Sequence, residues 1–284
     1  QYVFGLSIED LELILHPMVE DSKEATGSMG DDTPLAVLSD QYRPLSHYFR
    51  QNFSQVTNPP IDSLRENKVM SLRTRFGNLG NILNFNDLSK ENIYVLDSPI
   101  LSNSQFEKFK DYFKENYRII ECTFNKEDTL KVALDRIRSS AEIAAREGIK
   151  QIILTDKIID ENTLAIPMVL AVGAVNSHLI QKSLRGFISL NVQTGDVLDT
   201  HSYATLLGVG ATTINPYLAL DTICQRFEKN LFGKFDIEDC IKRYIKSVDN
   251  GLLKIMSKMG ISVLSSYRGG CNFETVGLSR AIVA

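Results

Sequence analysis

The sequence predicts an α/β fold, with a parallel sheet and flanking helices resembling an incomplete (β/α) barrel, preceded by an irregular N-terminal region. From about residue 92, short apolar segments alternate with longer segments of helical periodicity. Short apolar strands separated by helices are typical of a parallel sheet covered on both faces. The first ninety residues lack this alternation and are rich in turn-forming residues. We therefore expect residues 1–90 to form an irregular part with an interdomain loop, and residues 91–284 to form the β/α core of one domain.

The N-terminal region opens on a predicted helix. Ser7 is a suitable N-cap for an apolar pattern of helical spacing over residues 8–16. We expect this helix to end near His16, because Pro17 disfavours helical geometry at the residue before it. Residues 20–34 are rich in Gly, Ser, Asp and Thr, and predict a loop or turn. A second short helix is predicted over residues 44–53, with a proline in its first turn.

The core is predicted as an alternation of strands and helices, whereas residues 73–86 show no periodicity. The predicted strands cover residues 93–96, 118–123, 151–155, 187–192, 212–215 and 262–264. The predicted helices cover residues 106–112, 129–146, 164–182, 202–207, 217–227 and 237–258, the third being either one long helix or a short turn followed by one.

Composition excludes several functional classes. Hydrophobic residues make up 43% of the chain and charged residues 23%, as in ordinary globular proteins. A net charge of −4 with scattered Lys and Arg argues against a nucleic-acid partner. The apolar run at residues 166–175 is too short to span a bilayer, so we expect no membrane partner. No signal peptide opens the chain. Because it starts at Gln1 without a Met and ends abruptly at Ala284, we expect it to be a piece of a longer polypeptide.

The four cysteines predict free thiols in a reducing compartment. They lie at positions 122, 224, 240 and 271, and no two form a Cys-x-x-Cys pair. Metal and iron–sulfur sites usually take at least two thiolates from one short segment. We therefore predict neither a metal site nor a disulfide framework from these residues.

Two short segments raise the question of a ligand site. Gly208-Val209-Gly210 follows a predicted helix and precedes a predicted strand, which is the reverse of the order in a dinucleotide fingerprint. We interpret it as a turn whose glycines allow close backbone packing, and we assign no FMN to it. Asp31 and Asp32 are either an acid–base or metal-binding pair or, in the favoured interpretation, caps of a helix or turn.

The histidines, at positions 16, 47, 178 and 201, are dispersed, and none has a ligand at helical spacing. His178 is expected to be a partly buried hydrogen-bonding residue. His201, beside Ser202 and Tyr203, is a weak candidate for acid–base chemistry. No catalytic residue is predicted.

The segment Thr57-Asn58-Pro59-Pro60 is the strongest candidate for a functional role. Two consecutive prolines stiffen the backbone, while Thr57 and Asn58 offer short polar side chains. Such a loop is suited to lining a narrow passage with fixed donors and acceptors. The alternative is a rigid turn that joins domains.

Two sets of segments have a residue order too specific to arise from composition alone. The first set is Gly27–Pro34, Tyr42–Pro44 and Gln55–Asp62. The second is Gly251–Ser262 and Tyr267–Gly270. Together they resemble the central domain of the large subunit of glutamate synthase, ferredoxin- or NADPH-dependent. Leu170–Val175 and Asn215–Leu220 match in the expected order, so that the resemblance covers nearly the whole chain.

The resemblance implies a role in an oxidoreductase that makes two glutamates from glutamine and 2-oxoglutarate. In that family a central domain without a cofactor links an amidotransferase domain to a domain that carries FMN and an iron–sulfur cluster. It also lines a tunnel for ammonia. By this resemblance Gln55, Thr57, Asn58 and Asp62 are expected near the tunnel entrance or the domain boundary.

The resemblance also implies partners and a compartment. The partners are the two neighbouring domains of the parent chain and either ferredoxin or a small NADPH-oxidising subunit. The expected compartment is the cytoplasm, or the plastid stroma in a eukaryote. We expect this segment alone to be non-catalytic. Two alternatives stay open: a free-standing flavin- or phosphate-binding β/α protein, and a regulatory module that senses an amino acid.

Overall fold

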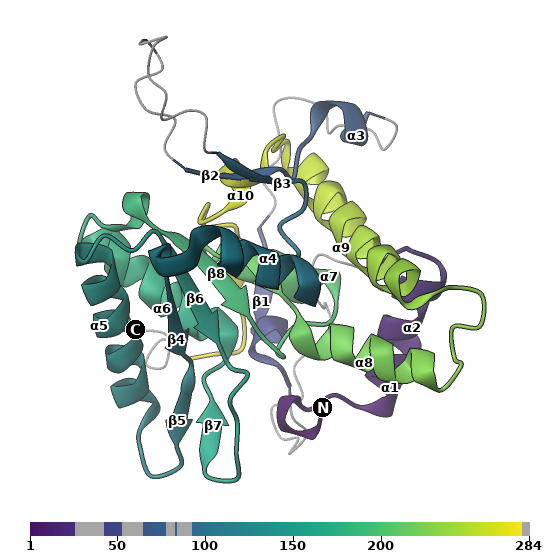
Figure 1. Ribbon diagram of the computed structural model, residues 1–284, viewed down its shortest axis with the longest axis horizontal. Helices are drawn as coiled ribbons and strands as arrows, with labels where there is room; N and C mark the ends of the chain where they lie inside the picture. The colour runs from purple at the N-terminus through teal and green to yellow at the C-terminus, as the bar shows by residue number, and fades with distance from the viewer. Residues whose placement is uncertain (26–42, 53–64, 78–82, 84–92, 280–284) are drawn as a thin grey trace.

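A four-stranded parallel sheet lies at the centre of the fold (Figure 1). The computed structural model describes residues 1–25, 43–52, 65–77, 83 and 93–279. The strands follow the order β4 (Tyr117–Glu121), β6 (Gln151–Thr155), β8 (Ser189–Gln193) and β9 (Thr213–Asn215). Every neighbouring pair is parallel. The predicted parallel sheet with flanking helices is confirmed.

Helices connect the strands and continue beyond the last of them, as the sequence predicts. They are α4 (Asn103–Phe113), α5 (Leu130–Arg146), α6 (Met168–Gln181), α7 (Thr200–Gly208), α8 (Tyr217–Glu228) and α9 (Ile237–Met259). Side-chain caps fix where several begin: Thr129 accepts a hydrogen bond from the Val132 N–H at the start of α5. At the start of α9, the Asp236 side chain accepts a hydrogen bond from the Asp239 N–H. This helix ends at Gly260, which has the left-handed conformation.

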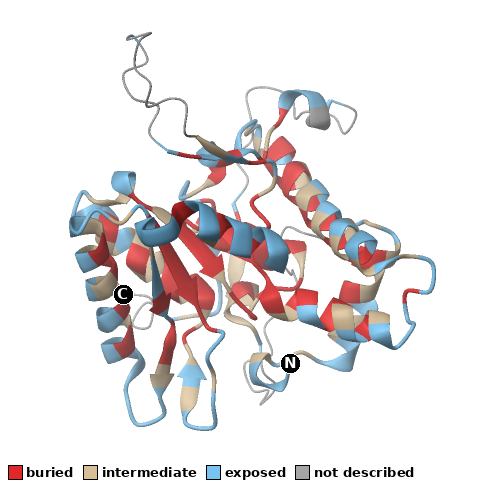
Figure 2. Cartoon of the chain, in the orientation of Figure 1, coloured by how far each residue is buried: buried red, intermediate tan, exposed pale blue. Residues whose placement is uncertain are grey.

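The two faces of the sheet are covered differently. Ile152 and Leu154 of β6 point into the large hydrophobic cluster that contains α5, α6 and α7. Ile153, on the opposite face, packs with aromatic residues of α4 in a second cluster. Figure 2 shows strands β6 and β8 largely buried, between helices whose outer faces are exposed. Burial on both faces explains why the strands are apolar enough to be recognised from sequence.

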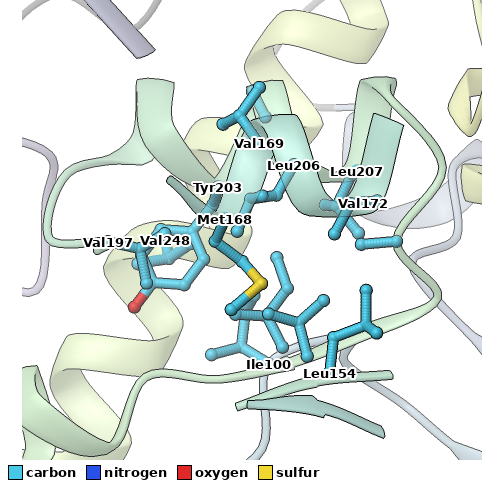
Figure 3. Packing of buried hydrophobic residues seen from close by; sticks show 14 of the residues in the cluster. Ile100, Leu154, Met168, Val169, Val172, Val197, Tyr203, Leu206, Leu207 and Val248 are labelled. Atoms are coloured by element: carbon cyan, nitrogen blue, oxygen red, sulfur yellow. The ribbon is translucent and has the colours of Figure 1, made fainter. Parts of the chain in front are cut away.

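The large cluster packs the sheet against helices α6, α7 and α9. Figure 3 shows Leu154 facing Met168 and Val172 of α6, with Tyr203 of α7 and Val248 of α9 close by. Tyr203 is fully buried, and its hydroxyl lies 2.9 Å from that of Tyr244, which donates to the Leu198 carbonyl at 2.7 Å. These hydrogen bonds satisfy the polar ends of two buried aromatic residues.

Three two-stranded antiparallel sheets surround the central one. They pair β1 (Phe49–Gln51) with β10 (Phe273–Thr275), β2 (Thr74–Phe76) with β3 (Tyr94–Leu96), and β5 (Thr123–Asn125) with β7 (Thr163–Ala165). The remaining short elements are η1 (Tyr2–Phe4), α1 (Ile8–Asp10), η2 (Leu11–Leu15), α2 (His16–Glu20), η3 (Leu45–Tyr48), α3 (Glu66–Val69), η5 (Lys114–Asn116), η6 (Arg185–Phe187) and α10 (Leu264–Tyr267).

Two predicted elements are of a different kind in the structure. The helix predicted over residues 44–53 is a 3₁₀ turn, η3, that passes into strand β1. The segment 262–264 makes only a single bridge, from Val263 to Ser71, before α10 begins. Of the two alternatives predicted for residues 164–182, the second is the closer one: the helix starts at Met168, after strand β7 and Pro167. Strand β2 was missed, within a stretch that showed no periodicity.

The N-terminal helix was predicted to end near His16 but continues to Glu20. A π-helical turn, η2, precedes Pro17, and the His16 N–H bonds to the Leu11 carbonyl. The wider turn places Pro17 at the start of the following helical segment, where a missing N–H is tolerated.

This N-terminal helix packs on the far end of the chain. Met18 and Val19 are buried in the same cluster as the sheet, and α2 lies against α9. The Arg243 guanidinium of α9 donates to the Val19 carbonyl at 2.7 Å. The division near residue 90 stays a prediction. Among the described residues, no helix has both the length and the apolar character needed to cross a bilayer.

Candidate functional site

Two acidic residues, one of them fully buried, lie at the carboxyl edge of the sheet, the edge where β/α proteins usually place their ligand sites. Asp156 directly follows β6 and is fully buried. Its carboxylate accepts hydrogen bonds from the Thr194 hydroxyl and, at 3.0 Å, from the Gly195 N–H, both in the loop after β8. Asp196, in the same loop, accepts from the Met168 N–H at 3.1 Å.

Burial governs the charge of these two carboxyl groups. It raises the pKa of Asp156 from 3.8 to about 7, against the opposing hydrogen bonds from Thr194 and Gly195. Burial likewise raises the pKa of Asp196 to about 6. The pKa of Tyr217 is also raised, first by burial and then by the nearby Asp156 carboxylate. The edge therefore holds a carboxyl group that is partly protonated near neutral pH.

A ladder of polar side chains crosses the same edge. Thr155, at the end of β6, donates to Gln193 at the end of β8 at 3.1 Å. Gln193 in turn donates to Asn215 at the end of β9, also at 3.1 Å. Asn215 donates to the Leu101 carbonyl and to Asn103, each at 3.0 Å. These hydrogen bonds connect the ends of the three strands, so the polar side chains of the ladder are hydrogen-bonded to one another.

The chain's own N-terminal turn covers part of this edge. A Cβ atom added to Gly195 would lie 2.6 Å from the Phe4 ring, so only glycine allows Phe4 to approach this closely. The Gln1 side chain donates to Thr222 of α8 at 3.0 Å. Part of the edge is therefore covered by side chains of the chain itself.

The predicted site residues Gln55, Thr57, Asn58 and Asp62 lie outside the described residues, as do Asp31 and Asp32. The structure does place the chain on both sides of the segment 53–64. Gln51 of β1 is buried, donates to the Asn272 carbonyl at 2.9 Å and accepts from the Tyr267 hydroxyl at 2.7 Å.

On the far side of this segment, the Ser71 N–H donates to the Ser262 carbonyl at 2.8 Å. The Ser71 carbonyl accepts from the Leu264 N–H at 3.1 Å. The chain is thus hydrogen-bonded to residues 262–272 on both sides of the segment 53–64, at Gln51 before it and at Ser71 after it. That region includes Tyr267–Gly270, which the sequence pattern grouped with the Gly251–Ser262 segment.

The interpretation of Gly208-Val209-Gly210 as a packing turn is confirmed. A Cβ atom at Gly208 would lie 2.4 Å from the Phe273 ring. One at Gly210 would lie 2.6 Å from Asn176, and the φ angle of Gly210 is +123°, which favours glycine. Close packing accounts for both glycines without a ligand.

The histidines and cysteines occupy structural positions. His178 lies 2.7 Å from the Glu142 carboxylate and is partly buried, as predicted. His201 is buried, with Nε2 2.9 Å from the Ser46 carbonyl. All four cysteines are free, and burial raises the pKa of the Cys122 thiol to about 12. In the described part of the chain, no group of three or more His, Cys, Asp or Glu residues could hold a metal ion.

Sequence reasoning missed Asp156 and Asp196. A usable signal was present, because Asp156 directly follows the strand predicted over residues 151–155. An acidic residue immediately after a buried parallel strand is placed at the carboxyl edge of the sheet. Nothing in the local pattern indicates that Thr194 and Gly195 would meet it.

A family model and several curated proteins match this chain over nearly its whole length. A family model described as "Glutamate synthase central domain" matches residues 1–279. The large chain of glutamate synthase [NADPH] from Azospirillum brasilense is 57% identical over 287 residues, covering 100% of this chain and 19% of that protein. The corresponding chain from Bacillus subtilis is 41% identical, over 100% of this chain and 18% of its own length.

The similarity extends to a plant protein. The chloroplastic ferredoxin-dependent glutamate synthase of Spinacia oleracea is 41% identical over 100% of this chain and 18% of its own. Among solved structures, a mutant flavocytochrome b2 with pyruvate bound superposes with a TM-score of 0.39 at 15% identity, over 64% of this chain and 43% of that one. The chain spans about a fifth of the length of these curated relatives. With the family model matched almost end to end, the chain belongs to the glutamate synthase central domain family.

Proposed function

We propose that this chain is the structural domain that links the amidotransferase and FMN domains of a glutamate synthase and lines the passage for ammonia between them. The match of the family model to residues 1–279 carries this proposal. The parent enzyme is then an oxidoreductase acting on CH–NH₂ groups, whereas this segment contributes no catalytic residue. FMN and the iron–sulfur cluster belong to other parts of the parent chain.

The proposed mechanism is confinement. A stiff polar passage keeps neutral ammonia away from bulk water, where it would be protonated and diluted, and so raises its effective concentration at the acceptor. In this scheme Thr57 and Asn58 present short hydrogen-bonding groups, between Gln55 and Asp62. The anchoring of Gln51 and Ser71 to residues 262–272 supports the proposal, because both ends of the segment are held by one packed region.

The partners follow from the same assignment. We propose the two neighbouring domains of the parent chain as permanent partners, and either ferredoxin or an NADPH-oxidising subunit as the source of electrons. The relatives include proteins named for each of these electron donors. We propose the cytoplasm as compartment, or the plastid stroma in a eukaryote.

The test is the coupling of two rates in the intact parent enzyme. Asn58→Leu removes a polar group from the proposed passage and adds bulk, so glutamine hydrolysis should exceed 2-oxoglutarate consumption several-fold, with ammonia released into solution. Asn162→Leu, at an exposed position next to β7, is the matched control and should leave the rates equal. Matched rates in Asn58→Leu would show that Thr57–Asn58 is only a hinge.

A further inference from the structure

The turn that contains Arg268 is held rigidly. The Arg268 N–H donates to the Leu264 carbonyl at 3.1 Å, and the next residue, Gly269, donates to the Gly208 carbonyl at 3.0 Å. The Tyr267 carbonyl accepts from the Asn272 side chain at 2.6 Å. These bonds hold the backbone on both sides of Arg268.

A second guanidinium is fixed beside the same glycine turn. Arg185 of η6 donates to the Asn176 side chain at 2.7 Å, to the Ile188 carbonyl at 2.5 Å and to the Gly210 carbonyl at 2.9 Å. All three acceptors are uncharged. These bonds orient Arg185, but they leave its positive charge without a carboxylate partner.

Two arginines therefore lie at the same glycine turn, Arg185 through its bond to the Gly210 carbonyl and Arg268 through its neighbour Gly269, which bonds to the Gly208 carbonyl. Burial, and then the charge of Arg185, lower the pKa of Arg268 from 12.5 to about 10. The Arg268 Nε atom is buried without a hydrogen-bond partner, and Nη2 makes one long contact, 3.4 Å to Thr74. Neither arginine forms an ion pair with any acidic residue in the described part of the chain. An unsatisfied buried donor and two uncompensated charges are both unfavourable.

We propose that Arg268 and Arg185 form a receptor for a carboxylate group, which enters beside Gly269. Gly269 and Gly270 are exposed, and a Cβ atom added to Gly269 would meet nothing within 4 Å, so this side of the turn is open. A guanidinium fork binds the two oxygens of a carboxylate in one plane, and the second cation adds charge attraction. The proposal does not depend on the ammonia passage.

The carboxylate has two possible sources: an acidic side chain from another part of the parent chain, or a free small carboxylate. The arginine side chains would bind the carboxylate group in the same way in both cases. The experiment therefore begins with the 284-residue chain and the probes acetate and succinate, and ends with the parent protein.

Thermal unfolding of the 284-residue chain is followed by circular dichroism in acetate, succinate or chloride at equal ionic strength. The carboxylates should raise the melting temperature saturably above the chloride value, by about 3 °C at ten times Kd. Arg268→Gln should abolish this rise. In chloride it should melt no lower than the wild type, because it removes the repulsion and the unsatisfied donor.

Two further variants serve as a control and as a test of the guanidinium fork. Arg138→Gln removes an exposed arginine of α5, paired with Asp135 at 3.1 Å, and should retain the full response to carboxylates. Arg268→Lys preserves the charge but not the fork, and should show a smaller rise. An equal melting temperature in chloride and carboxylates, or an unchanged response in Arg268→Lys, would refute the receptor. So would an Arg268→Gln variant that melts several degrees lower in chloride.

The parent protein then identifies the source. If a carboxyl side chain of the parent fills the receptor, free acetate and succinate will no longer raise the melting temperature, and Arg268→Gln will lower it. If the rise persists, free carboxylates are the ligand.

Discussion

Replacing Asp156 with asparagine should make the stability of the chain less dependent on pH. Asp156 is fully buried, and its pKa is raised from 3.8 to about 7 by burial. Between about pH 4 and pH 7 the folded chain therefore keeps a proton that the unfolded chain has released. Stability consequently falls as pH rises through this window.

The magnitude follows from the two pKa values. A pKa raised from 3.8 to about 7 corresponds to roughly 4 kcal/mol of stability that is present at low pH and lost by pH 8. Asparagine mimics the protonated acid: its oxygen accepts from the Gly195 N–H, and its amide donates to the Thr194 hydroxyl. Asp156→Asn should thus match the wild type near pH 4 and exceed its stability at pH 8.

The assay is urea denaturation at a series of pH values. Circular dichroism is the appropriate signal, since the chain contains no tryptophan. Asp160→Asn is a control of opposite sign, because the Asn162 N–H holds the pKa of exposed Asp160 below its usual value, so this variant should lose stability above pH 4. If Asp156→Asn keeps the wild-type pH slope, or is less stable at pH 8, the carboxyl group is charged in the folded chain and the reasoning is wrong.

Four further substitutions test the packing, each by urea denaturation. Gly210→Ala, at a φ of +123° with a Cβ contact of 2.6 Å, should cost more than about 2 kcal/mol, whereas Gly148→Ala, at positive φ but in open space, should cost about 1 kcal/mol. Leu154→Ala removes a fully buried side chain between the sheet and α6 and should cost about 2–5 kcal/mol. Tyr244→Phe leaves the buried Tyr203 hydroxyl without its partner and should cost about 1–3 kcal/mol. A cost below half of any of these values would contradict the packing described.

The parts of the fold that sequence patterns predicted are those with strong local periodicity. Helix α5 has an apolar stripe and a threonine cap, and β6 is a buried apolar run. Both signals lie within the element itself, so no distant partner is needed to recognise them.

The elements that were missed depend on distant partners. Strands β2 and β10 have three residues each, and β10 pairs with β1 from the other end of the chain. Pro17 misled the prediction, because the π turn before it relieves the constraint that ends an ordinary helix. The receptor formed by Arg185 and Arg268 joins positions far apart in sequence through the Gly208–Gly210 turn, which only the folded structure reveals.

The most direct test of the account is whether the chain itself performs chemistry. The purified 284-residue chain would be incubated with glutamine, 2-oxoglutarate and a reductant, and glutamate formation measured against a blank without protein. A structural domain predicts no glutamate above the blank. Sustained turnover would contradict the assignment of catalysis to the neighbouring domains.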